Sequence, residues 1–135
     1  MSVLKGSGVD LVGLSVVVPK NREDNQELNL LSEKGKSEII NQVGIRYRHV
    51  AKDNVAASDL CCKAAESLLS KLGWSAEEVG LVVFVTQTPD HIVPGSATQI
   101  QHRLGMASSS MALDINQGCA GYVYGMSALT GLMRA

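Results

Sequence analysis

The sequence predicts an α/β fold in which a mostly parallel sheet carries helices on both faces. Apolar, β-branched segments typical of buried strands alternate with segments whose apolar residues recur at helical spacing. The resulting order of strand, helix, strand, helix, strand and helix requires crossover connections. With 45% hydrophobic residues, the 135-residue chain is able to bury one core, as a single domain or one half of a larger one.

The first half of the chain contains one strand pattern and one helix pattern. Residues 9–18 are mainly apolar and β-branched and end before Pro19, which predicts a buried strand. Residues 20–42 are polar with scattered leucines and isoleucines, which predicts a surface excursion with one or two short helices. Apolar residues recur at helical spacing over residues 58–72, and Gly73 follows as a C-terminal stop.

The second half alternates short strands with helices. Capping-box patterns at residues 75–78 and 96–99 predict the starts of a short turn and of a helix that ends before Gly105. Between them, the run LVVFVT at residues 81–86 is typical of a fully buried strand. Residues 111–115 predict a further short strand.

The final segment, residues 120–133, predicts a helix without any charge, and its apolar residues surround the whole helix axis. Such a helix must be buried on every side. The sequence reaches Ala135 without a glycine cap or a polar turn. We therefore expect residues 1–135 to be the N-terminal half-domain of a longer protein. The alternative is a naturally short chain that buries this helix in an oligomer.

Charge and cysteine usage narrow the class of function. The 12 basic and 13 acidic residues are scattered, which argues against nucleic acid and anionic membranes as partners. The three cysteines form neither a disulfide framework nor a zinc-binding spacing, so we expect a reducing compartment and no metal site. Without a signal-peptide pattern in residues 1–14 or an apolar run of about 20 residues, we expect a cytoplasmic protein.

Cys119 lies at a predicted strand-to-helix corner, within LDINQGCAGYVYG at residues 113–125. A helix N-terminus favours thiolate over thiol and lowers a cysteine pKa from about 8.5 by one to several units. The backbone N–H of such a residue is able to face a developing oxyanion. Gly118 permits a sharp turn, while Ala120 and Gly121 leave the sulfur accessible. A small, buried, inert cysteine is the alternative interpretation.

Gly-Cys-Ala-Gly at residues 118–121, between a strand and Tyr122, resembles the active-site cysteine motif of β-ketoacyl-acyl-carrier-protein synthase III enzymes. Further resemblances follow the same order along the chain, in LVGLSVVVP at 11–19, VGIRYRHVA at 43–51 and the segment 79–105. Together they cover nearly the whole chain. They imply the N-terminal half of a thiolase-like fold, with the active site between two halves and a homodimer as the assembly.

The resemblance also implies the reaction. Cys119 accepts an acyl group from an acyl-coenzyme A or acyl-carrier-protein thioester, and malonyl-acyl-carrier protein then decarboxylates and attacks the acyl-enzyme. The implied partner is acyl carrier protein, with no bound cofactor. The family's catalytic histidine and asparagine come from the second half, so we expect this half alone to be inactive. His49, His91 and His102 are expected to be surface or structural residues.

Five positions bear on substrate binding under this resemblance. Val93 replaces a bulkier residue that limits the acyl pocket across the dimer, which predicts longer or branched primers unless Val93 merely packs. Gln42 and Glu38 replace an arginine and a tryptophan that hold coenzyme A, which predicts a primer on a carrier protein or another thioester. Arg46, like Arg48, either contacts phosphopantetheine or an acidic carrier protein, or forms a structural ion pair.

Two other functions fit the same residues. One is acyl transfer from Cys119 to an alcohol or amine without condensation. The other is a non-catalytic module that binds a carrier protein or forms dimers, in which Cys119 is inert. Cys61 and Cys62 lie inside a helical pattern and are expected to pack.

Overall fold

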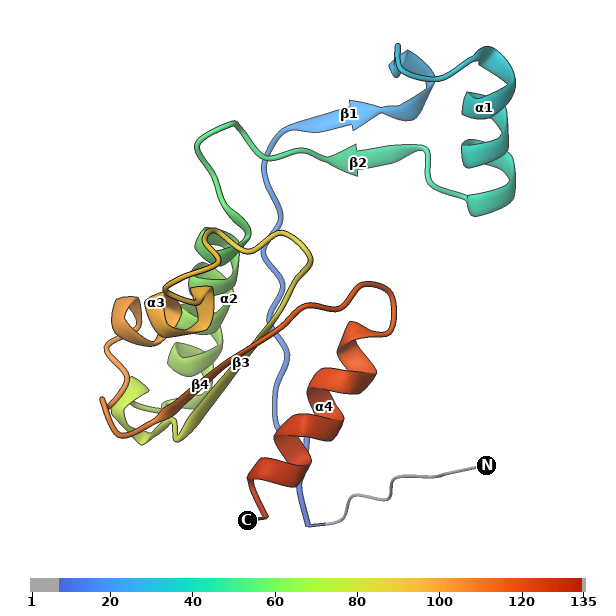
Figure 1. Cartoon of the computed structure of the whole chain (residues 1–135). Helices are drawn as coiled ribbons and strands as arrows, with labels where there is room; N and C mark the ends of the chain where they lie inside the picture. Colours follow the sequence, from blue (N-terminus) through green and yellow to red (C-terminus); the bar gives the residue numbers. More distant parts are fainter. Residues whose placement is uncertain (1–7, 135) are drawn as a thin grey trace. The chain divides into compact units, whose positions relative to one another are not determined.

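The computed structural model describes residues 8–134, which form two compact units (Figure 1). We call residues 8–17 with 57–134 the core unit, and residues 18–56 the hairpin unit. The parts of the predictions that concern residues 1–7 and 135 lie outside the described residues. Among the helices that are described, none has the length and apolar character needed to cross a membrane.

A two-stranded parallel sheet forms the centre of the core unit. Strand β3 (Leu81–Val85) pairs with β4 (Met111–Ile115), so that Leu81 lies opposite Met111 and Val85 opposite Ile115. Helix α3 (Ser96–Arg103) lies in the connection between them, as parallel neighbours require. Both strands and this helix were predicted from the sequence.

Helices cover both faces of this sheet (Figure 1). Helix α2 (Ala57–Leu72) and α3 pack on one face, and α4 (Gly121–Leu132) packs against β3 on the other. The α2 and α3 face contains the apolar core, which consists of Cys62, Phe84, Ala97 and Ile100. The predicted architecture of a parallel sheet between helical layers is therefore confirmed for this unit.

One prediction about burial is wrong. Strand β3 is not fully buried, because Phe84 alone among its residues is buried and β4 is its one strand neighbour in the described chain. In helix α4, Gly121 and Gly125 are the buried residues and Tyr122 is 68% exposed, so its burial on every side, expected in a longer protein or an oligomer, stays a prediction. The helix contacts the sheet with its small residues and leaves much of its apolar surface exposed.

Residues 9–18 do not form the predicted strand, because they join no sheet among residues 8–134. The part in the core unit contacts α2 instead. A Cβ placed on Gly13 would lie 2.7 Å from Leu68 Cδ1, which shows how closely the backbone approaches that helix. An apolar, β-branched pattern reports a tendency to be buried, whereas a strand also needs a free sheet edge to pair with.

The two predicted capping boxes have different outcomes. Ser75 begins the short turn η3 (Ala76–Glu78) as predicted, and its N–H donates to Glu78 Oε2 at 2.8 Å. The pattern at Ser96 is not a cap. Gly95 occupies the N-cap position of α3, and Ser96 is already the first helical residue.

The hairpin unit combines an antiparallel ribbon with short helical turns. Strand β1 (Arg22–Asp24) pairs with β2 (Tyr47–His49). Between them lie the short turns η1 (Asn25–Glu27), α1 (Glu33–Glu38) and η2 (Ile39–Val43). The short helices were predicted, but the ribbon was not, because its three-residue strands are polar and lack the alternation that marks longer strands.

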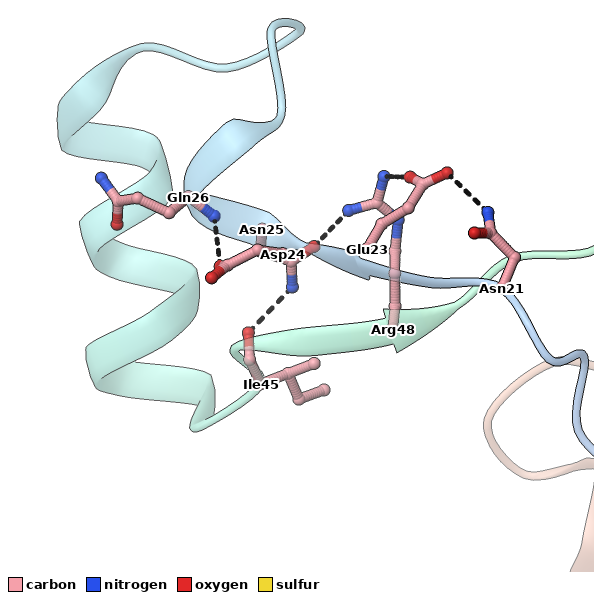
Figure 2. Close-up of polar contacts among 7 residues, drawn as sticks. All are labelled: Asn21, Glu23, Asp24, Asn25, Gln26, Ile45 and Arg48. Atoms are coloured by element: carbon pink, nitrogen blue, oxygen red, sulfur yellow. Dashed lines mark hydrogen bonds and ion pairs between the residues drawn. The ribbon is translucent and has the colours of Figure 1, made fainter.

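Polar contacts hold the hairpin unit together (Figure 2). Asn25, 5% exposed, donates to the Ile45 carbonyl at 2.8 Å and accepts a hydrogen bond from Arg48. Arg48 also pairs with Glu23 at 2.5 Å. The other buried residue described in this unit is a lysine, Lys36, whose ammonium group lies 2.7 Å from Glu33.

Candidate active site

Cys119 lies in the turn that connects β4 to α4, two residues before the first residue of the helix. The Gly121 N–H donates to the Gly118 carbonyl at 2.8 Å and closes this turn. The Tyr124 N–H then donates to the Ala120 carbonyl at 3.1 Å and begins the helical pattern. Cys119 is exposed, so a substrate is able to reach the sulfur.

The first turn of α4 keeps unpaired donors. Ala120, at the N-cap, provides no side-chain cap, and the N–H groups of Tyr122 and Val123 have no acceptor within residues 8–134. Free N–H groups and the helix dipole favour negative charge at a helix N-terminus. The corner is therefore suited to stabilise an oxyanion formed next to Cys119.

Two glycines bring α4 close to the sheet. A Cβ placed on Gly121 would lie 2.7 Å from Val85 Cγ1, and one on Gly125 would lie 2.9 Å from Val85 Cγ2. The Val85 side chain thus occupies the notch that these glycines leave. Gly121, which was predicted to leave the sulfur accessible, also allows the Cys119 helix to pack on β3.

Gly118 also has a packing role. Its φ does not lie in the left-handed region, so glycine is required here for space, in line with the prediction that a Cβ would clash at this turn. A Cβ placed on Gly118 would lie 2.8 Å from Oε1 of Gln87, a residue that follows the carboxyl end of β3. Gln87 was not among the predicted site residues. Its place after a predicted strand could have indicated it, because ligands of open α/β sheets bind at the carboxyl ends of the strands.

Asp114 on β4 supplies the cap of α3 that Ser96 was predicted to supply. The Ala97 N–H lies 3.0 and 3.1 Å from the two carboxylate oxygens of Asp114. Gly95 permits this contact, since a Cβ there would collide with the Asp114 carboxylate. Ser96 instead accepts a hydrogen bond from the Asp90 N–H at 3.0 Å.

Val93 lies on the loop between β3 and α3 and is 84% exposed. The base of this loop is fixed, because the Asp90 carboxylate accepts a hydrogen bond from Ser58 on α2. Arg103 supports the same cluster and donates to Ser58 Oγ at 3.1 Å. The Val93 side chain itself is free at the surface, and its role in an acyl pocket stays a prediction.

The chain is similar to known condensing enzymes over most of its length. It is 34% identical over 125 residues to β-ketoacyl-[acyl-carrier-protein] synthase III of Ehrlichia canis, and 34% identical over 125 residues to that of Rhodospirillum centenum. Over these residues the chain is similar to β-ketoacyl-acyl-carrier-protein synthase III. The match covers 93% of this chain but only 39% and 38% of these relatives, consistent with a resemblance to the N-terminal half. No family model matches the chain.

Solved structures show the same fold. The 3-oxoacyl-(acyl-carrier protein) synthase of Burkholderia xenovorans has a TM-score of 0.80 and 32% identity, over 89% of this chain and 36% of that one. An OleA structure from Xanthomonas campestris has a TM-score of 0.82 at 20% identity, over 94% of this chain and 39% of that one, and shows the fold alone. The predicted thiolase-like fold and the predicted resemblance to synthase III are confirmed.

In the hairpin unit, the ion-pair alternative for the two arginines is present. Arg46 Nε lies 3.2 Å from Asp24 Oδ2. Arg48 pairs with Glu23, as Figure 2 shows. The backbone hydrogen bond from Gln26 and the Arg46 guanidinium hold the pKa of Asp24 below its ordinary value. Because the Arg46 side chain is still 59% exposed, contact with a substrate phosphate stays a prediction.

The two residues predicted to replace coenzyme A anchors lie on neighbouring turns of the hairpin unit. Gln42 is exposed in η2. Glu38 ends α1, and its 51% exposed side chain lies 3.9 Å from Lys34. Their effect on the choice of primer stays a prediction.

The other two cysteines have environments that disfavour the thiolate. Cys61 is exposed, but the neighbours that cover part of its thiol raise the thiol pKa, and the negative charge of Asp90 adds to this effect. Burial also raises the pKa of Cys62, which packs in the core as predicted. Cys61 is exposed on α2 rather than packed. Neither residue is a suitable nucleophile.

None of the three histidines belongs to the turn that carries Cys119. His49 Nδ1 lies 2.6 Å from the Pro19 carbonyl oxygen, and His91 and His102 are exposed. Within residues 8–134, no group of three or more histidine, cysteine, aspartate or glutamate side chains is arranged to hold a metal ion.

Proposed function

We propose that this chain supplies the nucleophile-bearing half of an enzyme that catalyses acyl transfer and decarboxylative Claisen condensation. Cys119 accepts an acyl group from an acyl thioester, and malonyl-acyl-carrier protein supplies the carbon nucleophile. The product is a β-ketoacyl thioester of fatty-acid or related acyl-chain biosynthesis. The protein is expected to act as a cytoplasmic homodimer with acyl carrier protein as its partner.

The observation that carries this proposal is the position of Cys119. The sulfur is exposed at the corner between β4 and α4, in a chain similar to synthase III over 93% of its length. Close packing of Gly121 and Gly125 on Val85 holds that corner against β3. Covalent catalysis needs an accessible nucleophile in a fixed place, and this arrangement meets both requirements.

In the first step the Cys119 sulfur attacks the thioester carbonyl. A carbon–sulfur bond forms to Cys119, the bond to the donor sulfur breaks, and the donor leaves as a thiol with the proton that Cys119 loses. Free N–H groups at the start of α4 favour the oxyanion formed on the way. No residue of this chain is assigned to the later condensation step, for which the resemblance implies a histidine and an asparagine elsewhere.

In the second step the malonyl group loses carbon dioxide, and its carbanion attacks the acyl carbon. The bond to Cys119 breaks, and the sulfur takes up a proton. Gln42 and Glu38 in place of coenzyme A anchors support a primer on a carrier protein or another thioester. The small Val93 side chain supports longer or branched primers.

The test is product analysis with the protein at its natural length. We expect a β-ketoacyl thioester and carbon dioxide from an acyl primer and malonyl-acyl-carrier protein, measured by mass spectrometry. Cys119→Ser should lower the rate by roughly three orders of magnitude or more, because the intermediate no longer forms on sulfur. Cys61→Ser is the matched control and should retain activity.

Other outcomes would identify a different function. An acyl adduct on Cys119 that is passed to an alcohol or amine, without release of carbon dioxide, would indicate an acyltransferase. Absence of both product and adduct would indicate a non-catalytic module. Saturation by micromolar acetyl-coenzyme A with efficient acylation would contradict the proposed primer carrier, and reaction with acetyl primers alone would contradict the proposed role of Val93.

A further inference from the structure

Two primary amides flank the turn that carries Cys119. Gln117 precedes Gly118 within the turn, and Gln87 approaches Gly118 from the end of β3. A Cβ placed on Gly118 would lie 2.8, 3.1 and 3.3 Å from Oε1, Cδ and Nε2 of Gln87, so the whole amide group lies against this glycine. The residue next to the sulfur therefore has a hydrogen-bonding side chain directly over it.

Gly118 allows this arrangement. Its backbone does not adopt the left-handed conformation that other residues avoid, so glycine is required for space rather than for φ. Any larger residue would displace the Gln87 amide from the turn. The pairing of Gly118 with Gln87 thus keeps a polar group beside the nucleophile.

Within residues 8–134 the exposed Gln87 side chain has no competing hydrogen-bond partner. Neither Gln87 nor Gln117 forms a side-chain hydrogen bond to any residue between 8 and 134. The neighbouring hydroxyls of Thr86 and Thr88 lie 3.2 Å apart, and Thr86 Oγ1 also accepts from the Thr88 N–H at 3.0 Å. These threonines are satisfied locally, which leaves the Gln87 amide to water or to a ligand.

We propose that Gln87 is a specificity-determining residue that hydrogen-bonds an oxygen substituent near the thioester of the acyl group on Cys119. The preferred primers are then 3-hydroxyacyl or 3-ketoacyl groups rather than unsubstituted chains. An amide both donates and accepts, so it fits either substituent. An unsubstituted chain that displaces water from the amide leaves it unpaired, which disfavours that chain. This inference rests on the proposed acylation of Cys119.

The test compares two primers that differ by one oxygen atom. Hexanoyl and 3-hydroxyhexanoyl thioesters on the same carrier are supplied in turn, and the rate of Cys119 acylation is measured by intact-protein mass spectrometry. In the unmodified protein we expect the hydroxylated primer to react about tenfold faster. Gln87→Leu should bring the ratio close to one, whereas the control Gln26→Leu, in the hairpin unit, should leave it unchanged.

A second variant separates the roles of the amide and remains informative if Gln87→Leu fails to fold. Gln87→Glu keeps an acceptor but loses the donor, so it should retain preference for the 3-hydroxyacyl primer and lose preference for a 3-ketoacyl primer. Equal ratios in the unmodified protein and in the Gln87 variants would overturn the inference. Absence of any adduct at Cys119 in the unmodified protein would instead overturn the proposed function.

Discussion

The core unit and the hairpin unit are stabilised by different interactions. The core unit buries apolar side chains, with Cys62, Phe84, Ala97 and Ile100 no more than 5% exposed. The hairpin unit has no buried hydrophobic residue among those described, and its buried side chains are Asn25 and Lys36. Its ion pairs, such as Arg46 with Asp24, lie largely at the surface.

This difference explains where a nucleophile is best placed. Apolar burial contributes more per residue than exposed ion pairs, which are weak and screened by salt. The Cys119 corner belongs to the core unit, where the close fit of Gly121 and Gly125 on Val85 joins α4 to β3. We expect the hairpin unit to open locally at a lower free energy than the core unit, as polar regions with few apolar contacts do.

The largest expected effect comes from Phe84→Ala in the core unit. Phe84 is 5% exposed within the apolar cluster, so its truncation should lower the free energy of unfolding by roughly 3–5 kcal/mol. Leu30→Ala in the hairpin unit removes a side chain that is 89% exposed, so it should change the free energy of unfolding by less than about 0.5 kcal/mol. Denaturant unfolding followed by circular dichroism measures both. Similar losses in the two variants would contradict the comparison.

A moderate effect is expected from Gly121→Ala. The added methyl would lie 2.7 Å from Val85 Cγ1, which should cost roughly 1–3 kcal/mol of stability and displace the Cys119 corner. Gly131→Ala, in the same helix and with no atom within 4 Å of the added Cβ, should stabilise by about 0.4–1 kcal/mol.

The double variant Gly121→Ala with Val85→Ala tests the cause of that effect. Removing the valine methyl groups makes room for the new Cβ, so its stability should exceed the value obtained by adding the two single losses. Simple additivity in thermal or denaturant unfolding would show that Val85 does not set the packing of α4 on β3.

The smallest effect is the response of the hairpin unit to acid. The pKa of Asp24 is lower in the folded protein than its ordinary value of 3.8. The ionised Asp24 side chain therefore stabilises the fold fully above pH 3.8, and this stabilisation is lost as the pH falls through the pKa of the folded protein. Amide exchange at the Asn25 N–H, which donates to the Arg46 carbonyl at 2.8 Å, should therefore accelerate relative to the intrinsic rate below that pH. Asp24→Asn should reduce this pH dependence. If amide exchange at Asn25 keeps the same pH dependence in Asp24→Asn, groups other than Asp24 are responsible for it.

Much of the core unit could be predicted from the sequence, because its strands and helices show apolar periodicity over five or more residues. The Cys119 corner could also be predicted, since β4, the glycine turn and α4 are consecutive in the chain. Residues 9–18 were predicted wrongly as a strand, because their apolar pattern does not reveal whether a sheet edge is available to them.

The features that could not be predicted depend on contacts between distant residues. Asp114 caps α3 across 17 residues of sequence, and no local pattern distinguishes it from the capping box expected at Ser96. Gln87 meets Gly118 only once β3 and β4 pair in parallel. The polar strands β1 and β2 form around the buried Asn25 and its partners rather than around an apolar face.

The most direct test of the central claim is the mass of the protein after incubation with an acyl thioester and no malonyl donor. We expect one added acyl group, located by peptide mapping on the peptide that contains Cys119, and no such adduct in Cys119→Ser. An unmodified mass with every donor tried, or an adduct on Cys61 or Cys62 instead, would contradict the assignment of Cys119 as the nucleophile.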